Sequence, residues 1–481
     1  MARLALLALL ALQFGAPAAR AELPAPLLQQ LAEVGVPPEA VGLVVAPVAP
    51  GPRHLAHQVD RPLQPASTMK LVTTLVGLEQ LGPAWRGRTR LLAAGELAGG
   101  VLHGDLVLQG LGDMDLDVDA LRALLRRARL RGLAEVRGAL VLDRSAFQPT
   151  RLDQGLAPFD EAPEFGYNVI PDALLVNDNL LRVDLFVDDR GLQVMPLTPL
   201  AGVRVTHEMQ LVDGDCSRWD DGWQPPVVRP PGPGRLMDVV LRGSWPVRCE
   251  RTLSLNVIDR NEFIARLVRQ LWAELGGRWR GPVREGVAPP AARVLAERSS
   301  RPLSELVRAI NKPSDNAFTR TLYLALGRES PGDAAEPTLQ RAERAVRTWF
   351  HTRGIDDAGL VLDNGSGLSR SERLTPAQLE AVVRAGLASR WAPEFLASLP
   401  IAGVDGTLRR RLTGSAAAGT ARLKTGTLKN VVTLAGTMTD AAGQPLVVVV
   451  MFNHDNARPA RLRPVADALV DWVARQRFGP K

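Results

Sequence analysis

The sequence contains very little lysine. Of 58 basic residues only five are lysine, and the other 53 are arginine. Arginine keeps its proton in proteins, whereas a desolvated lysine can become a neutral base. Positions that retain lysine are therefore candidates for chemistry that arginine cannot perform. These positions are Lys70, Lys312, Lys424 and Lys429, while Lys481, at the end of the chain, is an ordinary surface residue.

Cysteine, histidine and aromatic residues are also scarce. The 481 residues include two cysteines and six histidines, with no HExxH motif and no CxxC pair. A zinc or thiol mechanism therefore has no ligands here, and we expect neither a metal nor a cofactor. The net charge of +7 favours anionic polymers, but the basic residues are scattered and aromatics make up only 5%. This composition is unlike a nucleic-acid platform, so no nucleic-acid partner is expected.

Long apolar runs are missing as well. Arg3 precedes nine apolar residues at 4–12, and Ala19-Arg20-Ala21 follows as a small-x-small cleavage site. This order predicts a secretory signal peptide over residues 1–21, cleaved after Ala21. An N-terminal anchor is the less favoured alternative, because crossing a bilayer takes roughly 20 helical residues. No later run reaches 18 apolar residues, so we expect an exported, periplasmic protein without an integral membrane segment.

The two cysteines, Cys216 and Cys249, are 33 residues apart. In an oxidising compartment they can close one loop, and such a disulfide would stabilise the fold by roughly 3–4 kcal/mol. Two free buried thiols are the alternative. Neither cysteine has a histidine within a few residues, so neither is a candidate nucleophile.

Hydrophobic periodicity gives a coarse map of the chain. It predicts helices over 25–34, 67–79, 121–132, 261–276, 303–328 and 460–478. Strands are expected at 41–46, 104–110, 138–143, 181–187, 430–438 and 445–452, and the proline-rich stretch 222–234 is expected to be a loop. Strands followed by a terminal helix indicate an α/β protein of the α+β type, with an antiparallel sheet covered by helices.

Three short motifs carry reactive side chains. Ser67-x-x-Lys70 lies at a helix start, where residues i and i+3 share a face, so hydroxyl and amine can touch. Ser314-Asp-Asn316 lies near a turn, and Lys424-Thr-Gly lies in a strand-like run. Each motif alone is more often structural: a helix-surface pair, an Asx-turn or a strand end. Together, two of five lysines fall on motif positions and Lys312 precedes Ser314 by two residues, which chance does not explain.

The chemistry of these side chains suggests acyl transfer. Ser67 needs a nearby base to become a nucleophile. Lys70, desolvated and close to the second cation Lys424, would have a lowered pKa and act as that base. Ser314 can relay a proton to the leaving amine, and Asn316 can hold the substrate amide and Lys70.

The third motif is expected to bind the substrate. Lys424, with the hydroxyl of Thr425 or Thr427, would hold a substrate carboxylate, and Gly426 would let the substrate backbone approach the strand. Backbone N–H groups of Ser67 and Thr427 would form the oxyanion hole.

The three motifs in this order resemble those of penicillin-binding proteins and class A β-lactamases. Four further segments, at 65–74, 363–370, 399–408 and 424–436, are similar to one family among them. This is the class C low-molecular-mass penicillin-binding proteins, the serine D-alanyl-D-alanine carboxypeptidases/endopeptidases (S13 peptidases). The segment 110–115 resembles a family turn but lacks the expected proline.

The resemblance implies a function and a domain plan. It implies a D-Ala-D-Ala carboxypeptidase and DD-endopeptidase that acts on peptidoglycan stem peptides and is acylated by β-lactams; the balance between the two activities stays open. Ser67 and Ser314 are 247 residues apart, far more than a loop in a compact domain. The family plan therefore divides the chain into a transpeptidase-like domain (22–88 and 291–481) and an inserted, β-rich region (89–290) of two nested subdomains.

Two rival functions are weighed against this one. A class A β-lactamase would need a Glu-x-x-Leu-Asn element, but Leu255-Asn256 is preceded by Thr252. A class C β-lactamase would need Tyr-x-Asn, which neither Tyr167 nor Tyr323 provides, and no Gly-x-Ser-x-Gly elbow indicates a lipase-like fold. A non-catalytic wall-binding protein would have no reason to keep the serine and both lysines of the motifs.

Other candidate sites have plainer explanations. Asp113, Asp115, Asp117 and Asp119 alternate, but a calcium loop would need glycine and glutamate where valine and leucine stand, so we expect these residues to cap the following helix. The segment 363–370 is expected to be a glycine-rich bend that shapes the cleft. The arginine-rich helix at 122–131 is expected to be a solvated face, and the six histidines are assigned to surface or core.

Overall fold

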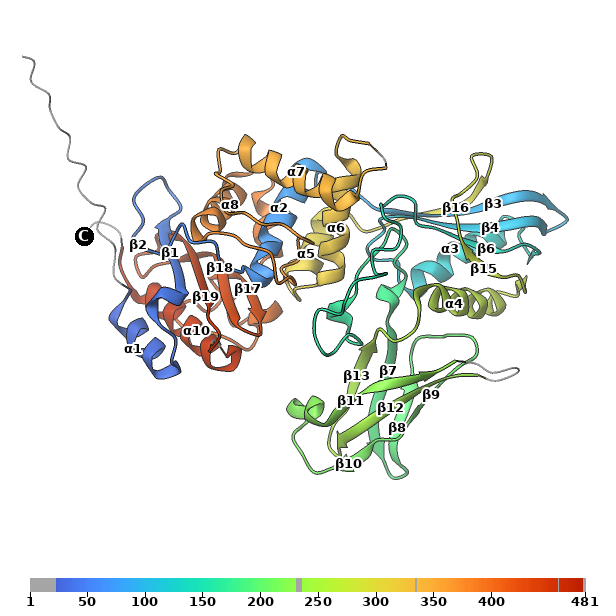
Figure 1. Cartoon of the computed structure of the whole chain (residues 1–481), viewed down its shortest axis with the longest axis horizontal. Coiled ribbons are helices and arrows are strands. Elements are labelled where there is room, and N and C mark those ends of the chain that lie inside the picture. The colour runs from blue at the N-terminus through green and yellow to red at the C-terminus, as the bar shows by residue number, and fades with distance from the viewer. Residues whose placement is uncertain (1–22, 231–235, 334, 457, 479–481) are drawn as a thin grey trace, which may run out of the picture.

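The computed structural model describes residues 23–230, 236–333, 335–456 and 458–478. The predicted signal peptide, residues 1–21, lies outside these residues. Figure 1 shows two parts: a helix-covered sheet built from both ends of the chain, and an insert built from its middle. No helix in the described part of the chain combines the length and apolar character needed to span a bilayer.

A five-stranded antiparallel sheet forms the centre of the first part. Its strands, in spatial order, are β17 (Arg422–Leu428), β18 (Val431–Thr439), β19 (Pro445–Asn453), β1 (Val41–Pro47) and β2 (Leu55–His57). The N-terminal strand β1 pairs along its whole length with β19, from Val41 opposite Phe452 to Pro47 opposite Leu446. The sheet is therefore assembled from segments at opposite ends of the sequence.

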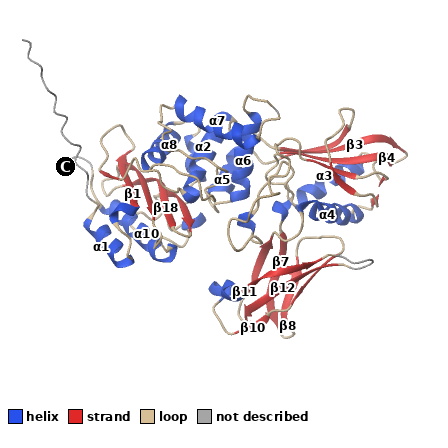
Figure 2. Ribbon diagram, in the orientation of Figure 1, coloured by secondary structure: helices blue, strands red, loops and turns tan. Residues whose placement is uncertain are grey.

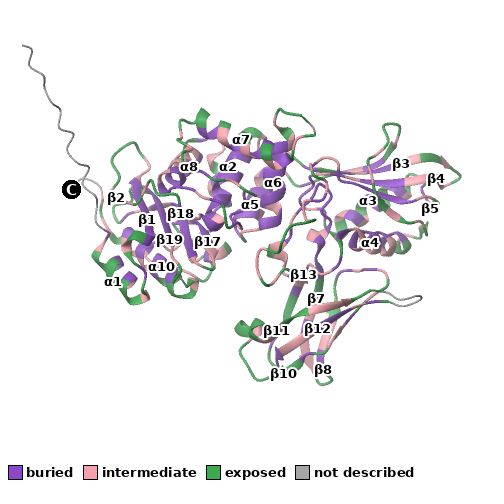
Figure 3. Cartoon of the chain, viewed as in Figure 1, coloured by how far each residue is buried: buried purple, intermediate pink, exposed green. Residues whose placement is uncertain are grey.

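The central sheet is buried on both faces around β1 and β19, whose residues are apolar almost throughout. In β1, Leu43 and Val45 join one core, while Val44 and Ala46 join the other. Two helices cover the first face, α1 (Ala25–Val34) and α10 (Pro459–Arg475). Six cover the second: α2 (Lys70–Gln80), α5 (Leu303–Asn311), α6 (Asn316–Glu329), α7 (Thr338–Thr352), α8 (Pro376–Ala388) and α9 (Ala392–Ser398). Figures 2 and 3 show this layering and the burial of the strands, which confirm the predicted fold class.

The insert contains three sheets that share one hydrophobic core. The seven-stranded sheet consists of β3 (Arg88–Ala98), β4 (Val101–Leu111), β5 (Glu135–Val136), β6 (Leu140–Asp143), β14 (Arg278–Trp279), β15 (Val283–Glu285) and β16 (Arg293–Ser299). Helices α3 (Val118–Leu130) and α4 (Arg260–Glu274) contribute to the same core. Since β16 pairs with β3, this sheet extends from Arg88 to Ser299, slightly beyond both ends of the range 89–290.

Two smaller sheets lie between the strands of the larger one in sequence. The first contains β7 (Leu181–Asp188), β8 (Gly191–Pro196) and β13 (Arg251–Leu255). The second contains β9 (Val203–His207), β10 (Gln210–Val212), β11 (Trp223–Arg229) and β12 (Met237–Pro246). The predicted disulfide between Cys216 and Cys249 is present, with the two Cα atoms 4.9 Å apart.

The predicted loop at 222–234 is wrong over Trp223–Arg229, which forms β11; residues 231–235 lie outside the described part. This strand tolerates Pro225 and Pro226 because it lies at a sheet edge and its register shifts between Gln224 and Val227.

The predicted helix over 303–328 is in fact two helices, α5 and α6. Pro313 prevents continuation beyond Lys312, and Ser314 takes a left-handed conformation (φ 68°) before Asp315 caps α6 by accepting the Phe318 N–H. This interruption places the second motif at a helix junction.

The alternating aspartates only partly cap the next helix. Asp117 is the N-cap of α3 and accepts the Ala120 N–H. Asp113 and Asp115 instead form ion pairs with Arg298 of β16. These two carboxylates therefore tie the start of the insert to its end.

Candidate active site

The first motif lies where the 3₁₀ turn Ala66–Met69 runs into α2. The Lys70 Nζ is 3.0 Å from the Ser67 Oγ, as predicted from their spacing on one helix face. Lys70 is completely buried, whereas Ser67 is half-buried and accessible. Ala66, just before the serine, has a positive φ of 46°, in the left-handed region that non-glycine residues seldom adopt. Such conformations persist where the surroundings enforce them, often at functional sites.

Lys70 has two further oxygen partners. Its Nζ donates to the Asn316 Oδ1 at 2.6 Å and to the Ser366 carbonyl oxygen at 2.5 Å. Desolvation by burial lowers the pKa of Lys70 from 10.5 to about 7. The amine therefore becomes neutral near physiological pH, as a general base requires.

The second motif connects Lys70 to Lys424. Asn316, the first residue of α6, accepts from Lys70 and donates from its Nδ2 to the Tyr167 carbonyl oxygen at 2.9 Å. Ser314 lies two residues earlier, and its Oγ accepts from the Lys424 Nζ at 2.9 Å. The structure thus forms two hydrogen-bonded sets, one of Ser67, Lys70 and Asn316 and one of Ser314 and Lys424. The short segment from Ser314 to Asn316 joins them.

The third motif lies on strand β17. Lys424 is completely buried, and burial together with the nearby charge of Lys70 holds its pKa well below the usual value. The Thr425 hydroxyl bonds to that of Thr407 at 2.8 Å. Thr427 is half-buried.

The close packing around Gly426 gives a second reason for glycine at this position, besides the predicted approach of the substrate backbone. A Cβ atom there would lie 2.1 Å from the Thr433 Oγ1 and 2.9 Å from both the Pro65 carbonyl oxygen and the Ser67 nitrogen. Any side chain at this position would push the strand away from the turn that carries Ser67.

The comparison with known families agrees with this geometry. The D-Ala-D-Ala carboxypeptidase 3 (S13) family matches residues 25–476, nearly the whole chain. The chain belongs to this S13 family. It is therefore a serine-type D-Ala-D-Ala carboxypeptidase, a hydrolase.

Individual relatives align with most of this chain. The D-alanyl-D-alanine carboxypeptidase of Actinomadura sp. (strain R39) is 29% identical over 455 residues, 90% of this chain and 82% of the relative. The D-alanyl-D-alanine carboxypeptidase DacB of Haemophilus influenzae is 27% identical over 390 residues, 81% of this chain and 80% of the relative. The crystal structure of penicillin binding protein 4 (dacB) from H. influenzae matches the fold with a TM-score of 0.75 and 24% identity, covering 94% of this chain and 99% of that one.

The sequence did not reveal every group around Lys70. The predicted repulsion between Lys70 and Lys424 is present, since burial and the charge of Lys70 together lower the pKa of Lys424. The sequence did not reveal Arg320 on α6, which lowers the Lys70 pKa, or Asp315 and Glu372, which raise it. The Ser366 carbonyl oxygen, a main-chain acceptor, was also missed. The sequence did predict that the bend 363–370, which contains Ser366, would shape the cleft, but not that one of its carbonyl groups would bind Lys70.

Lys312, the third lysine near a motif, has a supporting role. Its Nζ forms an ion pair with Asp405 at 2.6 Å and donates to the Leu399 carbonyl oxygen at 2.6 Å. These contacts hold the 399–408 segment, whose Thr407 bonds to Thr425. This lysine therefore fixes the wall behind the third motif.

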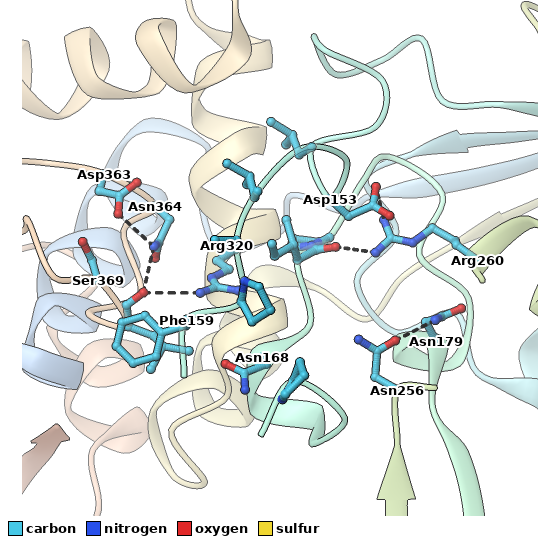
Figure 4. Close-up of a pocket in the computed structure, with 18 of the residues that line it drawn as sticks. Asp153, Phe159, Asn168, Asn179, Asn256, Arg260, Arg320, Asp363, Asn364 and Ser369 are labelled. Carbon is cyan, nitrogen blue, oxygen red and sulfur yellow. Dashed lines mark hydrogen bonds and ion pairs between the residues drawn. The ribbon is translucent and has the colours of Figure 1, made fainter. Parts of the chain in front are cut away.

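A cavity of about 450 Å³ lies beside this S13 site. Figure 4 shows Arg320 of α6 in the middle of its lining, with Asp363, Asn364 and Ser369 of the bend on one side and Asp153 and Arg260 on the other. Arg320 lies four residues, about one helical turn, beyond Asn316, so the cavity is a neighbour of the catalytic group. The two share the 363–370 bend as a common wall.

Proposed function

We propose that the protein hydrolyses D-Ala-D-Ala bonds in peptidoglycan stem peptides through an acyl-enzyme on Ser67, as a carboxypeptidase and DD-endopeptidase that remodels the cell wall. We further propose that it works in the periplasm after signal cleavage at Ala21, and that β-lactams acylate the same serine. The observation that carries the proposal is the buried Lys70 amine, 3.0 Å from the Ser67 Oγ with a pKa of about 7.

Lys70 is oriented to accept a proton in its neutral form. A neutral amine has two N–H bonds and one lone pair. The Asn316 Oδ1 and the Ser366 carbonyl oxygen each accept one N–H, which leaves the lone pair for the Ser67 hydroxyl. Ser67 then donates its proton to the Lys70 Nζ as its Oγ attacks the carbonyl carbon of the penultimate D-Ala.

The remaining residues complete the acyl transfer. Backbone N–H groups of Ser67 and Thr427 stabilise the oxyanion of the tetrahedral intermediate. When the C–N bond breaks, the proton held by Lys70 passes by way of Ser314 to the leaving amine. Water then attacks the ester carbonyl carbon while Lys70 takes a proton from it. When the bond to the Ser67 Oγ breaks, Lys70 returns this proton to the Oγ, which releases the carboxylic acid product and regenerates neutral Lys70.

Substrate recognition is assigned to the third motif and to Asn316. Lys424, with Thr425 or Thr427, would hold the terminal carboxylate of D-Ala-D-Ala, and Gly426 keeps this strand against Ser67. Asn316 would bind the substrate amide. No step in this sequence calls on a cofactor.

The test is intact mass after incubation of the mature protein with benzylpenicillin, beside Ser67→Ala. A single stable adduct, absent from the variant, would establish Ser67 as the nucleophile of a slowly deacylating enzyme. Rapid drug hydrolysis without an adduct would instead favour a β-lactamase. Neither adduct nor turnover would favour a wall-binding protein and contradict the proposal.

A further inference from the structure

Glu372 is a buried carboxylate just after the 363–370 bend. Its side chain is 1% exposed, and its Oε1 accepts the Gly365 N–H at 2.7 Å and the Asn364 N–H at 3.1 Å. The other oxygen, Oε2, is buried without a hydrogen-bond partner in the described part of the chain. Burying a carboxylate is costly unless it is well compensated, so the position of Glu372 calls for a physical reason.

The bend held by Glu372 contacts α2 at two successive carbonyl groups. The Thr73 hydroxyl donates to the Gly365 carbonyl oxygen at 2.6 Å, and the Lys70 Nζ donates to that of Ser366 at 2.5 Å. The bend is also pressed against the residue before the nucleophile, since a Cβ on Gly367 would lie 1.8 Å from the Ala66 carbonyl oxygen. A shift of the bend would therefore move the oxygen that orients Lys70.

The charges around Lys70 act on it in opposite directions. Arg320 of α6 disfavours the protonated amine, whereas Glu372 and Asp315, the α6 N-cap, favour it; Lys424 of β17 also lies nearby. Burial raises the pKa of Glu372 to about 7; the charge of Asp363 acts in the same direction, and that of Lys70 opposes it. Figure 4 shows Arg320 directed toward the bend that carries Asp363 and Asn364.

We propose that Glu372 is a positioning residue for Lys70. Through the Asn364 and Gly365 N–H groups it fixes the bend so that the Ser366 carbonyl oxygen orients the amine, and through its charge, opposed by that of Arg320, it sets how readily the amine holds a proton. This inference rests on the proposed role of Lys70 as the base for Ser67.

Two variants separate the two effects. Glu372→Gln keeps an oxygen for the N–H groups but removes the charge, so protonated Lys70 loses a favourable neighbour. The acidic limb of the acylation rate against pH should then move to lower pH. The shift should be smaller than one full charge would give, because Glu372, with a pKa of about 7, already binds a proton over part of this range. Glu372→Asp keeps the charge but withdraws the carboxylate, so acylation should slow by roughly 10- to 100-fold with the limb in place.

Two more variants sharpen the test. Arg320→Gln should move the limb in the opposite direction, to higher pH. Glu380→Gln, a matched control on α8 whose buried carboxylate binds Arg53 and Arg384, should leave the profile unchanged. The measurement is the second-order rate of acylation of the mature protein by benzylpenicillin from pH 5 to 9, with melting temperatures for each variant.

The outcomes are distinct. If the acidic limb of Glu372→Gln coincides with that of the wild type, or moves to higher pH, the electrostatic role is overturned. If Glu372→Asp is acylated at the wild-type rate, the positioning role is overturned. If a Glu372 variant does not fold, an Arg320→Gln limb that stays in place or moves to lower pH still overturns the opposing charge that the proposal assigns to Arg320. Failure of the wild-type protein to be acylated at all would instead refute the function on which the inference rests.

Discussion

Two groups of buried cations in this molecule have different kinds of hydrogen-bond and ion-pair partners. Lys70 and Lys424 contact hydroxyl, amide and main-chain oxygens, and their ion-pair distances to carboxylates exceed 4 Å throughout the described residues. Arg144 and Arg260, within the insert, both bind one oxygen of Asp172 at 2.7 Å. The four cations and Asp172 are each at most 5% exposed.

The difference separates chemistry from support. A buried cation without a paired carboxylate lowers its pKa and can exchange its proton near neutral pH, which suits a base. A buried cation held by a carboxylate keeps its charge and serves as a fixed link. The sequence reflects this division, because the first group uses lysine in a chain that otherwise uses arginine almost everywhere.

The largest effect is expected from exchanging the cation in the first group. Lys70→Arg keeps the charge but cannot supply a neutral base, so acylation by benzylpenicillin should fall by roughly 10²- to 10⁴-fold. Lys429→Arg, at an exposed position, is the matched control and should acylate normally. Acylation at the wild-type rate in Lys70→Arg would refute the neutral-lysine role.

Breaking the second group should affect stability instead. Asp172→Asn leaves two buried arginines without their shared carboxylate and should lower the free energy of unfolding by about 3–5 kcal/mol. Chemical denaturation measures this loss, and Asp238→Asn, which disrupts the surface pair with Arg204, should cost far less. An unchanged midpoint in Asp172→Asn would show that the two groups are not different in kind.

The pH dependence of the wild type follows from the Lys70 pKa of about 7. Only neutral Lys70 accepts the serine proton, so the acylation rate should rise with pH, by roughly tenfold per unit well below 7, and level off above it. Stopped-flow measurement with benzylpenicillin between pH 5 and 9 tests this. A rate that stays flat down to pH 5 would mean that the base is not Lys70.

The smallest effect is expected at Lys312, the lysine with a carboxylate partner. Arginine can also pair with Asp405, so Lys312→Arg should change stability by less than about 1 kcal/mol and leave acylation nearly unchanged. Lys312→Met, which loses the pair, should loosen the 399–408 segment and slow acylation modestly. A severe defect in Lys312→Arg would place this lysine with Lys70 rather than with the structural cations.

Local patterns predicted most of the central fold. The apolar runs of β1 and β19 and the helical spacing of α1 and α10 are strong signals, since they are long and uninterrupted. The strand β11 was missed because Pro225 and Pro226 normally exclude a strand, and only its position at a sheet edge permits them. The division of 303–328 into α5 and α6 was missed although Pro313 marks it.

For the candidate site, motif spacing predicted which side chains gather but not what surrounds them. Lys70 and Ser67 share a helix face, so their contact follows from the sequence alone. The Ser366 carbonyl oxygen and Glu372 reach Lys70 only through tertiary packing of a bend some 300 residues away in the sequence. Main-chain acceptors and buried charges of this kind have no local signature.

The pairing of β1 with β19 also has a consequence for biosynthesis. Val41 must find Phe452, near the opposite end of the chain. At a translation rate of roughly 5–20 residues per second, β1 waits on the order of 20 to 80 s for its partner. During that time the insert between them can complete its own core, while an apolar strand remains uncovered. The enzyme's central sheet can therefore close only after its C-terminal strands have been made, when the whole insert has already been synthesised.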